Sequence, residues 1–460
     1  MAFSEFLCGG PDCFSPPTLT CGDCRQAHYC GRPCALAAWH SAHKAECAAL
    51  ATARRRLPAP ARKELERLEA GSVSAARAAV LLRTSKCFDP VAVMAVATIA
   101  AAARTRAGAA ALIAAEAPLE LVFFARNAAA MRDAGRVQLL SRALARLAST
   151  AAGEAACIQA GAPAVLIALL SGAGRGSAAA AGRLAFALAS LTGDTTSQSA
   201  LIKAGAPAAL VAALGYAALH NSAFAAMHIA DALGGMWERA GQRASVLAGL
   251  PEAAAAAAQW PAVRANAAAV AKVARVLTCS RKYPEGIAAS IAAGAPALLV
   301  GLLSLAPVLG SADALASVAC ALGDAGEDTA AWREAVAGAG AGAALAALLR
   351  MELVQGCCSA LTNAARAVES VAGCGPCRRL AVVTVAVPVR LAMASRRRPC
   401  LVAHLSSFFA GFAPPTTRRA AHSTCAPHAH APRTLARRRA GVGTGGARPE
   451  IEWPNGLFWA

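Results

Sequence analysis

Cysteine and histidine side chains gather near the start of the chain at spacings that suit metal binding. Seven cysteines and one histidine fall into four pairs: Cys8 with Cys13, Cys21 with Cys24, Cys30 with Cys34, and His43 with Cys47. Within each pair, a short turn or one helical turn can direct both ligand atoms at a single metal. Four sulfur or nitrogen ligands complete a tetrahedral zinc site. The eight ligands therefore predict two zinc ions, and the spacing leaves open which pairs share a metal.

The predicted zinc ions are structural rather than catalytic. A catalytic zinc keeps one position open for a reacting water, and eight ligands fill both sites. Residues 1–50 contain few large apolar side chains, so metal binding has to supply much of the folding free energy of this segment. We therefore expect a small zinc domain over residues 1–50.

The order of these pairs resembles the MYND zinc finger over residues 8–47. The Tyr29-Cys30 step, Trp39 before the last pair and the final His43-Lys44-x-x-Cys47 carry the resemblance. The resemblance implies that the pairs interleave, with one zinc held by Cys8, Cys13, Cys30 and Cys34 and the other by Cys21, Cys24, His43 and Cys47. MYND fingers bind short proline-containing peptides through a surface that includes a Gln and a Trp. Trp39 is thus the candidate peptide-binding residue, while Ala35 replaces the Gln and removes a hydrogen-bonding amide.

Composition predicts an all-α protein after this zinc domain. Hydrophobic residues make up 57% of the chain but aromatic residues only 5%, and much of the apolar content is alanine. Alanine has the highest helix propensity and is depleted in sheets.

One phrase recurs along the middle of the chain. AGAPAVLIALL at 160–170 returns as AGAPAALVAAL at 204–214 and as AGAPALLVGLL at 293–303. Its glycines, with two weaker copies included, lie 44, 44, 45 and 46 residues apart, at Gly161, Gly205, Gly249, Gly294 and Gly340. Such a period is typical of helical solenoids. In each copy the glycine predicts a left-handed helix end, and the proline that follows suits the first turn of the next helix.

These repeats resemble the armadillo repeat, with HEAT repeats as the alternative of the same architecture. We expect the solenoid over residues 70–370. Many armadillo proteins hold peptides with a ladder of asparagines on the third helix of each repeat. Alignment by phrase places at that position Thr98, Arg146, Ser190, Gly235, Arg275, Cys320 and Asn363. A single Asn makes no ladder, so we expect protein binding by other residues of the concave face.

The remaining segments carry most of the other signals. Residues 51–69 are basic and proline-interrupted, which predicts a linker, and residues 371–460 predict a basic, disordered tail that contributes much of the net charge of +19. The uncharged stretch 286–312 is long enough for a membrane span, but its glycines and prolines favour buried solenoid helices, so we expect no membrane association. Thiolate ligands and a start without a secretory signal predict a reducing compartment, the nucleus or the cytoplasm.

Together these features predict a zinc-binding adaptor for other proteins, including a role in transcriptional regulation, with no enzymatic activity and no small-molecule substrate. The alternatives are an enzyme similar to the lysine methyltransferases that contain MYND fingers, and a nucleic-acid-associated protein that acts through the basic tail.

Overall fold

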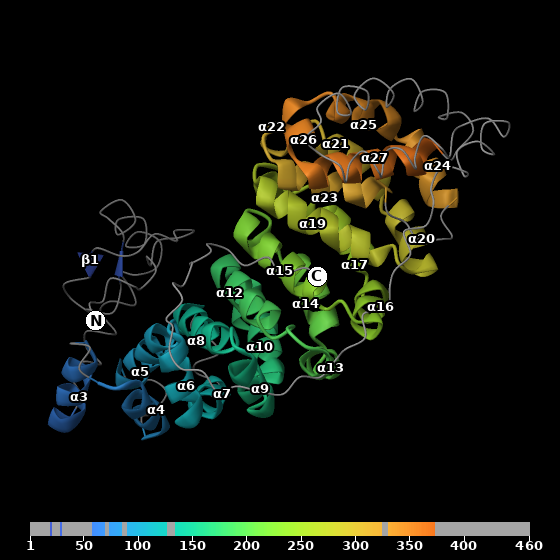
Figure 1. The fold of residues 1–460 in the computed structure, drawn as a ribbon. Coiled ribbons are helices and arrows are strands. Elements are labelled where there is room, and N and C mark those ends of the chain that lie inside the picture. Colours follow the sequence, from blue (N-terminus) through green and yellow to red (C-terminus); the bar gives the residue numbers. More distant parts are fainter. Residues whose placement is uncertain are drawn as a thin grey trace, which may run out of the picture. The chain divides into compact units, whose positions relative to one another are not determined.

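The computed structural model describes residues 19–20, 28–29, 58–69, 73–84, 90–126, 134–323 and 330–372. The chain divides into two units, Met1–Ser406 and Ser407–Ala460, and all described residues lie in the first. Between residues 58 and 372 the described elements are helices, as expected for an armadillo-like α-solenoid (Figure 1). The predicted tail over 371–460 lies outside the described residues, apart from the end of the last helix.

Each full repeat contains three main helices. The first helices are α6 (Arg106–Ala114), α9 (Ala151–Gln159), α13 (Thr195–Lys203), α16 (Arg239–Leu247), α20 (Pro284–Ala292) and α24 (Ala330–Gly338). The second helices are α7 (Ala117–Ala125), α10 (Ala162–Ser171), α14 (Ala206–Leu214), α17 (Leu250–Ala257), α21 (Ala295–Leu302) and α25 (Ala341–Leu349). The third helices are α8 (Ala134–Leu147), α12 (Ala178–Ala189), α15 (Ala223–Gly235), α19 (Ala267–Ser280), α23 (Ala312–Gly323) and α27 (Cys358–Ala372).

The repeats are preceded by three further helices and interrupted by short ones. The preceding helices are α3 (Ala59–Glu69), α4 (Ala75–Thr84) and α5 (Pro90–Ala102). Short helical turns before the later third helices are α11 (Ala173–Gly176), η3 (Ala217–Leu219), α18 (Pro261–Arg264), α22 (Ala306–Leu309) and α26 (Glu352–Gly356). The repeated phrase does not predict these short helices.

The turn between the first and second helices has the predicted geometry. Five glycines, from Gly161 to Gly340, have φ between 72° and 88°, the left-handed region in which a Cβ is unfavourable. At the corresponding turn of the first full repeat, Glu116 has φ 57°. The prolines that follow occupy the first turn of the second helix, where a missing N–H costs nothing. The glycine period therefore marks a real bend between helices.

The third helices begin at short polar side chains. Ser177, Ser222 and Asn266 each accept a hydrogen bond from the backbone N–H three residues later, at 3.1 to 3.3 Å. These caps satisfy one of the N–H groups that the first helical turn leaves unpaired. Because they recur at the same place in successive repeats, they give a reference point for comparing the third helices.

The helical region begins earlier than the linker prediction allows. α3 spans Ala59–Glu69, within the residues expected to form a linker, and its Leu65 and Leu68 are buried. α3 packs against α5, so it shields the apolar end of the solenoid. Pro58 and Pro60 lie just before and in the first turn of α3, where proline is tolerated rather than helix-breaking.

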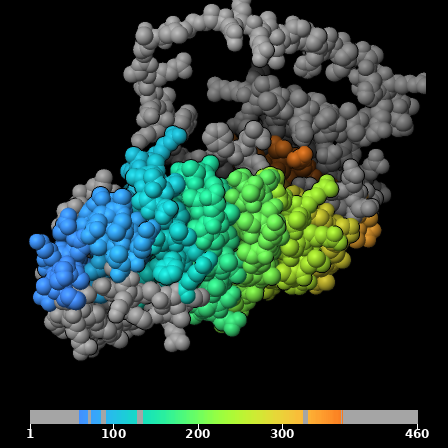
Figure 2. All heavy atoms as spheres, turned by 90° about the horizontal axis from the view of Figure 1, so that it is seen from below, coloured from blue at the N-terminus to red at the C-terminus, as the bar shows by residue number. Residues whose placement is uncertain are grey.

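Neighbouring third helices pack against one another from α5 to α27 and form a continuous row, which we call the third-helix ladder (Figures 1 and 2). Small residues allow a close approach between them. A Cβ at Gly323 of α23 would lie 2.5 Å from the Cα of Ala367 in α27. The alanine-rich composition therefore serves close helix packing.

Among the described residues, no single helix is long and apolar enough to cross a membrane, although four bent helix pairs pass that test together by length and composition. One pair is α20 with α21, from the stretch 286–312, and its helices meet at 69°. Leu299 and Leu302 of α21 are buried within the solenoid. The predicted buried helices are thus observed.

Replacing Gly205 by Ala is expected to lower the free energy of unfolding by about 1 kcal/mol, because a Cβ is disfavoured at φ 85°. No heavy atom lies within 4 Å of the added Cβ, so the effect is conformational rather than steric. Gly301→Ala, inside α21 and equally open, is the matched control and should stabilise by roughly 0.5 to 1 kcal/mol. Denaturant unfolding followed by circular dichroism measures both, and the same sign for the two variants would contradict the turn assignment.

Candidate protein-binding surface

The predicted zinc ligands and Trp39 lie outside the described residues. β1 (Leu19–Thr20) and β2 (His28–Tyr29) are described, and they pair antiparallel, with Leu19 opposite Tyr29 and Thr20 opposite His28. In sequence, Cys21 follows β1 directly, Cys24 lies between the strands, and Cys30 follows β2. A thiolate-rich donor set around a short hairpin fits structural zinc. The individual ligands remain predictions.

The third-helix ladder has its own register, which differs from the alignment by phrase. Counted from the capping residues, Ser190 and Gly235 each lie 13 residues after their caps Ser177 and Ser222, whereas Arg275 lies 9 residues after Asn266. The phrase alignment therefore compared residues from different turns of the helix. That part of the sequence interpretation is wrong in detail, because the phrase is degenerate while the cap is not.

Two rows of functional side chains follow from the cap register. The residues 6 positions after the caps are Arg183, His228 and Lys272, and those 9 positions after are Phe186, Asp231 and Arg275. Positions three to four apart share one helix face, so the two rows are neighbours on the ladder. These rows place charged and aromatic side chains on a framework otherwise rich in alanine.

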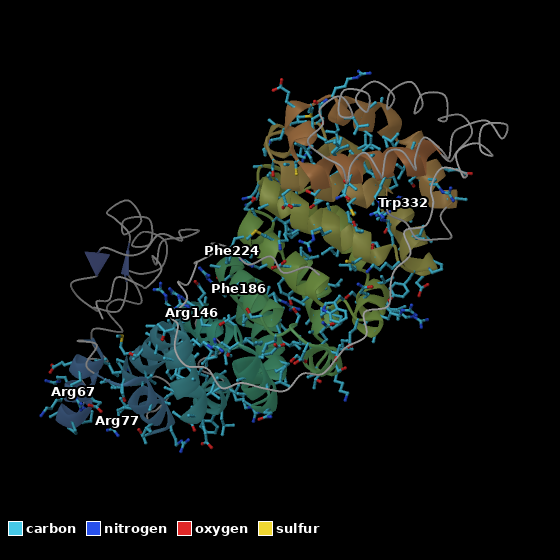
Figure 3. All side chains as sticks on the ribbon, viewed as in Figure 1. Arg67, Arg77, Arg146, Phe186, Phe224 and Trp332 are labelled. Carbon is cyan, nitrogen blue, oxygen red and sulfur yellow. The ribbon has the colours of Figure 1, made fainter. Side chains whose placement is uncertain are left out.

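Aromatic rings connect α12 and α15 on this surface. The His228 ring packs edge-on against Phe224, at 4.4 Å between centroids, and against Phe186, at 5.0 Å. The Arg183 guanidinium lies 5.0 Å from the centre of the Phe224 ring. Phe186 is 37% exposed, and Figure 3 shows Phe186 and Phe224 on their neighbouring helices. The rings therefore form a partly accessible apolar platform beside a cation.

Arginines extend this surface onto α8. Burial lowers the pKa of Arg142 to about 9, and the nearby charges of Arg146, Arg183 and Arg104 lower it further. Burial, with the charge of Arg146, lowers the pKa of Arg183 to about 10. Both side chains are still cationic at neutral pH. Arg146 also donates a hydrogen bond from Nη1 to the carbonyl of Ala100 in α5, so it is partly engaged in joining repeats. We call Arg142, Arg146, Arg183, Phe186, Phe224 and His228 the arginine–aromatic cluster.

The cluster is bounded by an ion pair and has a neutral centre. Lys272 Nζ donates to Asp231 Oδ1 between α19 and α15. Burial lowers the pKa of His228 to about 4; the Arg183 and Lys272 charges lower it further, while Asp231 opposes the shift. Its Nδ1 is buried and has no hydrogen-bond partner in the described part of the chain. His228 is thus uncharged at neutral pH and acts as a third ring of the platform.

Asn363 does not form the first rung of an asparagine ladder. Its Nδ2 donates to the carbonyl of Ala316 in the neighbouring α23, at 3.1 Å. This amide hydrogen bond joins two repeats rather than facing a peptide.

The sequence interpretation missed the arginine–aromatic cluster. The signal was the spacing from each short polar cap, Ser177, Ser222 or Asn266, to the sixth and ninth residues beyond it. No group of three or more His, Cys, Asp or Glu side chains suited to a metal occurs in the part of the chain that the structure describes.

Comparison with protein families identifies the first module. Residues 8–47 match the family model of the MYND finger. The chain thus carries a MYND zinc finger ahead of its armadillo-like solenoid. No curated protein matches the chain.

Similar solved structures include engineered and designed repeat proteins. One engineered protein is 25% identical, with a TM-score of 0.45, and the match covers 55% of this chain and 98% of the other. A designed armadillo repeat protein is 20% identical, with a TM-score of 0.40, covering 65% of this chain and all (100%) of the other. At these TM-scores, neither likeness bears on what this chain binds.

Proposed function

We propose that the chain is a zinc-dependent protein-interaction adaptor with two binding surfaces, the MYND finger and the third-helix ladder. The observation that carries the proposal is the pair of side-chain rows on the ladder. Successive repeats bring Arg183, Phe186 and His228 together from helices whose other positions are mostly alanine. A repeat surface that concentrates rings and cations in this way is suited to recognise another chain.

The adaptor reading assigns the chain no catalytic step. We propose two structural zinc ions in the finger and a site of action in the nucleus or cytoplasm, where thiolate ligands stay reduced. A role in transcriptional regulation is a finer proposal that rests on the resemblance of the finger alone.

Affinity capture with three full-length baits tests the adaptor function. The baits are the natural chain, the variant Trp39→Ala in the finger, and the double variant Arg142→Met/Arg183→Met in the ladder. We expect each variant to lose a different set of partners in quantitative mass spectrometry. Identical partner sets for all three baits would contradict a function in binding proteins through these surfaces.

The finger is expected to bind proline-containing peptides weakly and through Trp39. A Trp ring offers a flat apolar platform for a proline ring, whereas the amide that would hold the peptide backbone is replaced by Ala35. Ala35→Gln should tighten binding by roughly 0.5 to 1.5 kcal/mol, the net worth of one hydrogen bond, and Trp39→Ala should abolish it. Calorimetric titration of the zinc-loaded chain measures both changes. If Trp39→Ala binds as tightly as the natural chain, recognition lies elsewhere.

A further inference from the structure

The first three helices of the third-helix ladder carry a one-sided charge. The sequences of α5, α8 and α12 contain no Asp or Glu, whereas α8 and α12 contribute Arg142, Arg146 and Arg183 to the cluster. Arg104, just beyond α5, adds to the same positive field. The charge changes sign at α15, where Asp231 binds Lys272. The positive region is therefore confined to a few helices.

The concentrated charge opposes folding. Because the pKa values of Arg142 and Arg183 are lowered in the folded chain, keeping both protonated at neutral pH costs stability. Bound anions offset repulsion among half-buried cations, and a half-buried setting strengthens each charge–charge contact. The cluster is thus electrostatically complementary to an anionic ligand.

The geometry of Arg183 leaves room for such a ligand. A guanidinium that lies over a ring uses its flat face for the contact, while its N–H groups point outward in the guanidinium plane toward acceptors at its edge. Arg183 lies over Phe224 in this manner. Carboxylates suit that edge because they accept two parallel hydrogen bonds. The adjoining rings of Phe186 and His228 provide an apolar contact beside the charge.

We propose that the arginine–aromatic cluster binds an acidic linear peptide of a partner protein, with carboxylates against Arg142 and Arg183 and an adjacent aromatic side chain against Phe186. This inference rests on the proposed function and specifies the ligand of the ladder. Nucleic acid fits less well, because proteins that follow a phosphate backbone neutralise many phosphates along a track. Here the positive region ends at the Asp231–Lys272 pair after three helices.

The test uses the full-length chain and a fluorescein-labelled peptide that contains four consecutive acidic residues followed by Phe. Fluorescence anisotropy gives the affinity, and a peptide with lysines in place of the acids is the charge control. Arg142→Met and Arg183→Met should each weaken binding about tenfold, the loss expected for one charge-assisted contact. Arg366→Met, an exposed ladder arginine in α27 at the opposite end, is the matched control and should leave the affinity unchanged.

Thermal unfolding separates a binding role from a structural role. Because removing Arg142 relieves repulsion, Arg142→Met should keep or raise the Tm while it weakens binding. A lower Tm with unchanged affinity would show that Arg142 is structural and would overturn the proposal. Arg142→Lys, which keeps the charge but not the paired donors, should recover part of the affinity.

The remaining outcomes also decide the question. Failure of the acidic peptide to bind overturns the inference, and the adaptor function still stands if the double variant has lost partners in affinity capture. An oligonucleotide of matched charge that binds more tightly than the peptide, and is weakened by the same variants, would overturn it in favour of nucleic acid.

Discussion

Native mass spectrometry of the full-length chain should show two bound zinc ions per molecule. The reason is the donor set: seven cysteines and His43 form two complete tetrahedral sites in a segment too small to fold by apolar burial. Cys30→Ala should release metal and unfold the finger, since structural zinc contributes about 10 kcal/mol or more to the folding of such segments. The solenoid, which has its own core, should keep its helical circular dichroism in the same variant.

Cys357→Ala is the matched control for that experiment. Cys357 lies between α26 and α27, and hydrogen bonds to its sulfur from the Ser359 side chain and nearby backbone lower its pKa, so it is a reactive cysteine outside the finger. Its loss should leave two zinc ions in place. A natural chain that carries one zinc or none would contradict the two-site assignment, and zinc loss in Cys357→Ala would show that the finger does not hold all of the metal.

The turns of the solenoid were predictable because their backbone geometry depends on residue type. A left-handed turn strongly favours glycine, and proline suits the helical position that follows, so the period from Gly161 to Gly340 could be read directly. The same logic covers the weaker unit at Glu116, whose φ of 57° matches the glycine positions. Local chemistry and global architecture agree at these turns.

The start of the solenoid was less predictable because burial depends on partners far away in sequence. Pro58 and Pro60 indicated a linker, but Leu65 and Leu68 are buried in a helix that packs against α5. Proline in the first turn of α3 is compatible with both interpretations, so the local signal was ambiguous.

The ladder was predictable as a row of helices but not as a surface. A phrase such as A-L-x-N fixes a residue's position only when the whole phrase is present, and here it is degenerate. One residue of error turns a side chain by about 100° around the helix. Hydrogen-bonded caps define the start of a helix physically, and only from them do Arg183, His228 and Lys272 align.

Trp332→Ala is expected to destabilise the last two repeats by roughly 3 to 5 kcal/mol, the usual cost of removing a fully buried Trp. Trp332 in α24 is 0% exposed, and its Nε1 donates to the carbonyl of Leu322 in α23 at 3.1 Å. The Arg281 guanidinium, at the end of α19, lies 4.3 Å from its ring. One side chain thus joins three repeats near the end of the described solenoid, and Figure 3 shows its position there.

A double-mutant cycle separates the cavity left by Trp332 from the charge of Arg281, which is buried and donates to the carbonyls of Leu277 and Cys320 at 3.4 Å. Trp332→Ala alone leaves that cation without its ring, so Arg281→Met combined with Trp332→Ala should cost less than Trp332→Ala alone. Trp237→Ala, at a 50% exposed Trp, is the control and should change stability by no more than about 0.5 kcal/mol. Hydrogen exchange of α24 to α27 with circular dichroism measures the losses. Strictly additive effects would show that the cation and the ring do not stabilise each other, and that cavity formation accounts for the whole cost of removing Trp332.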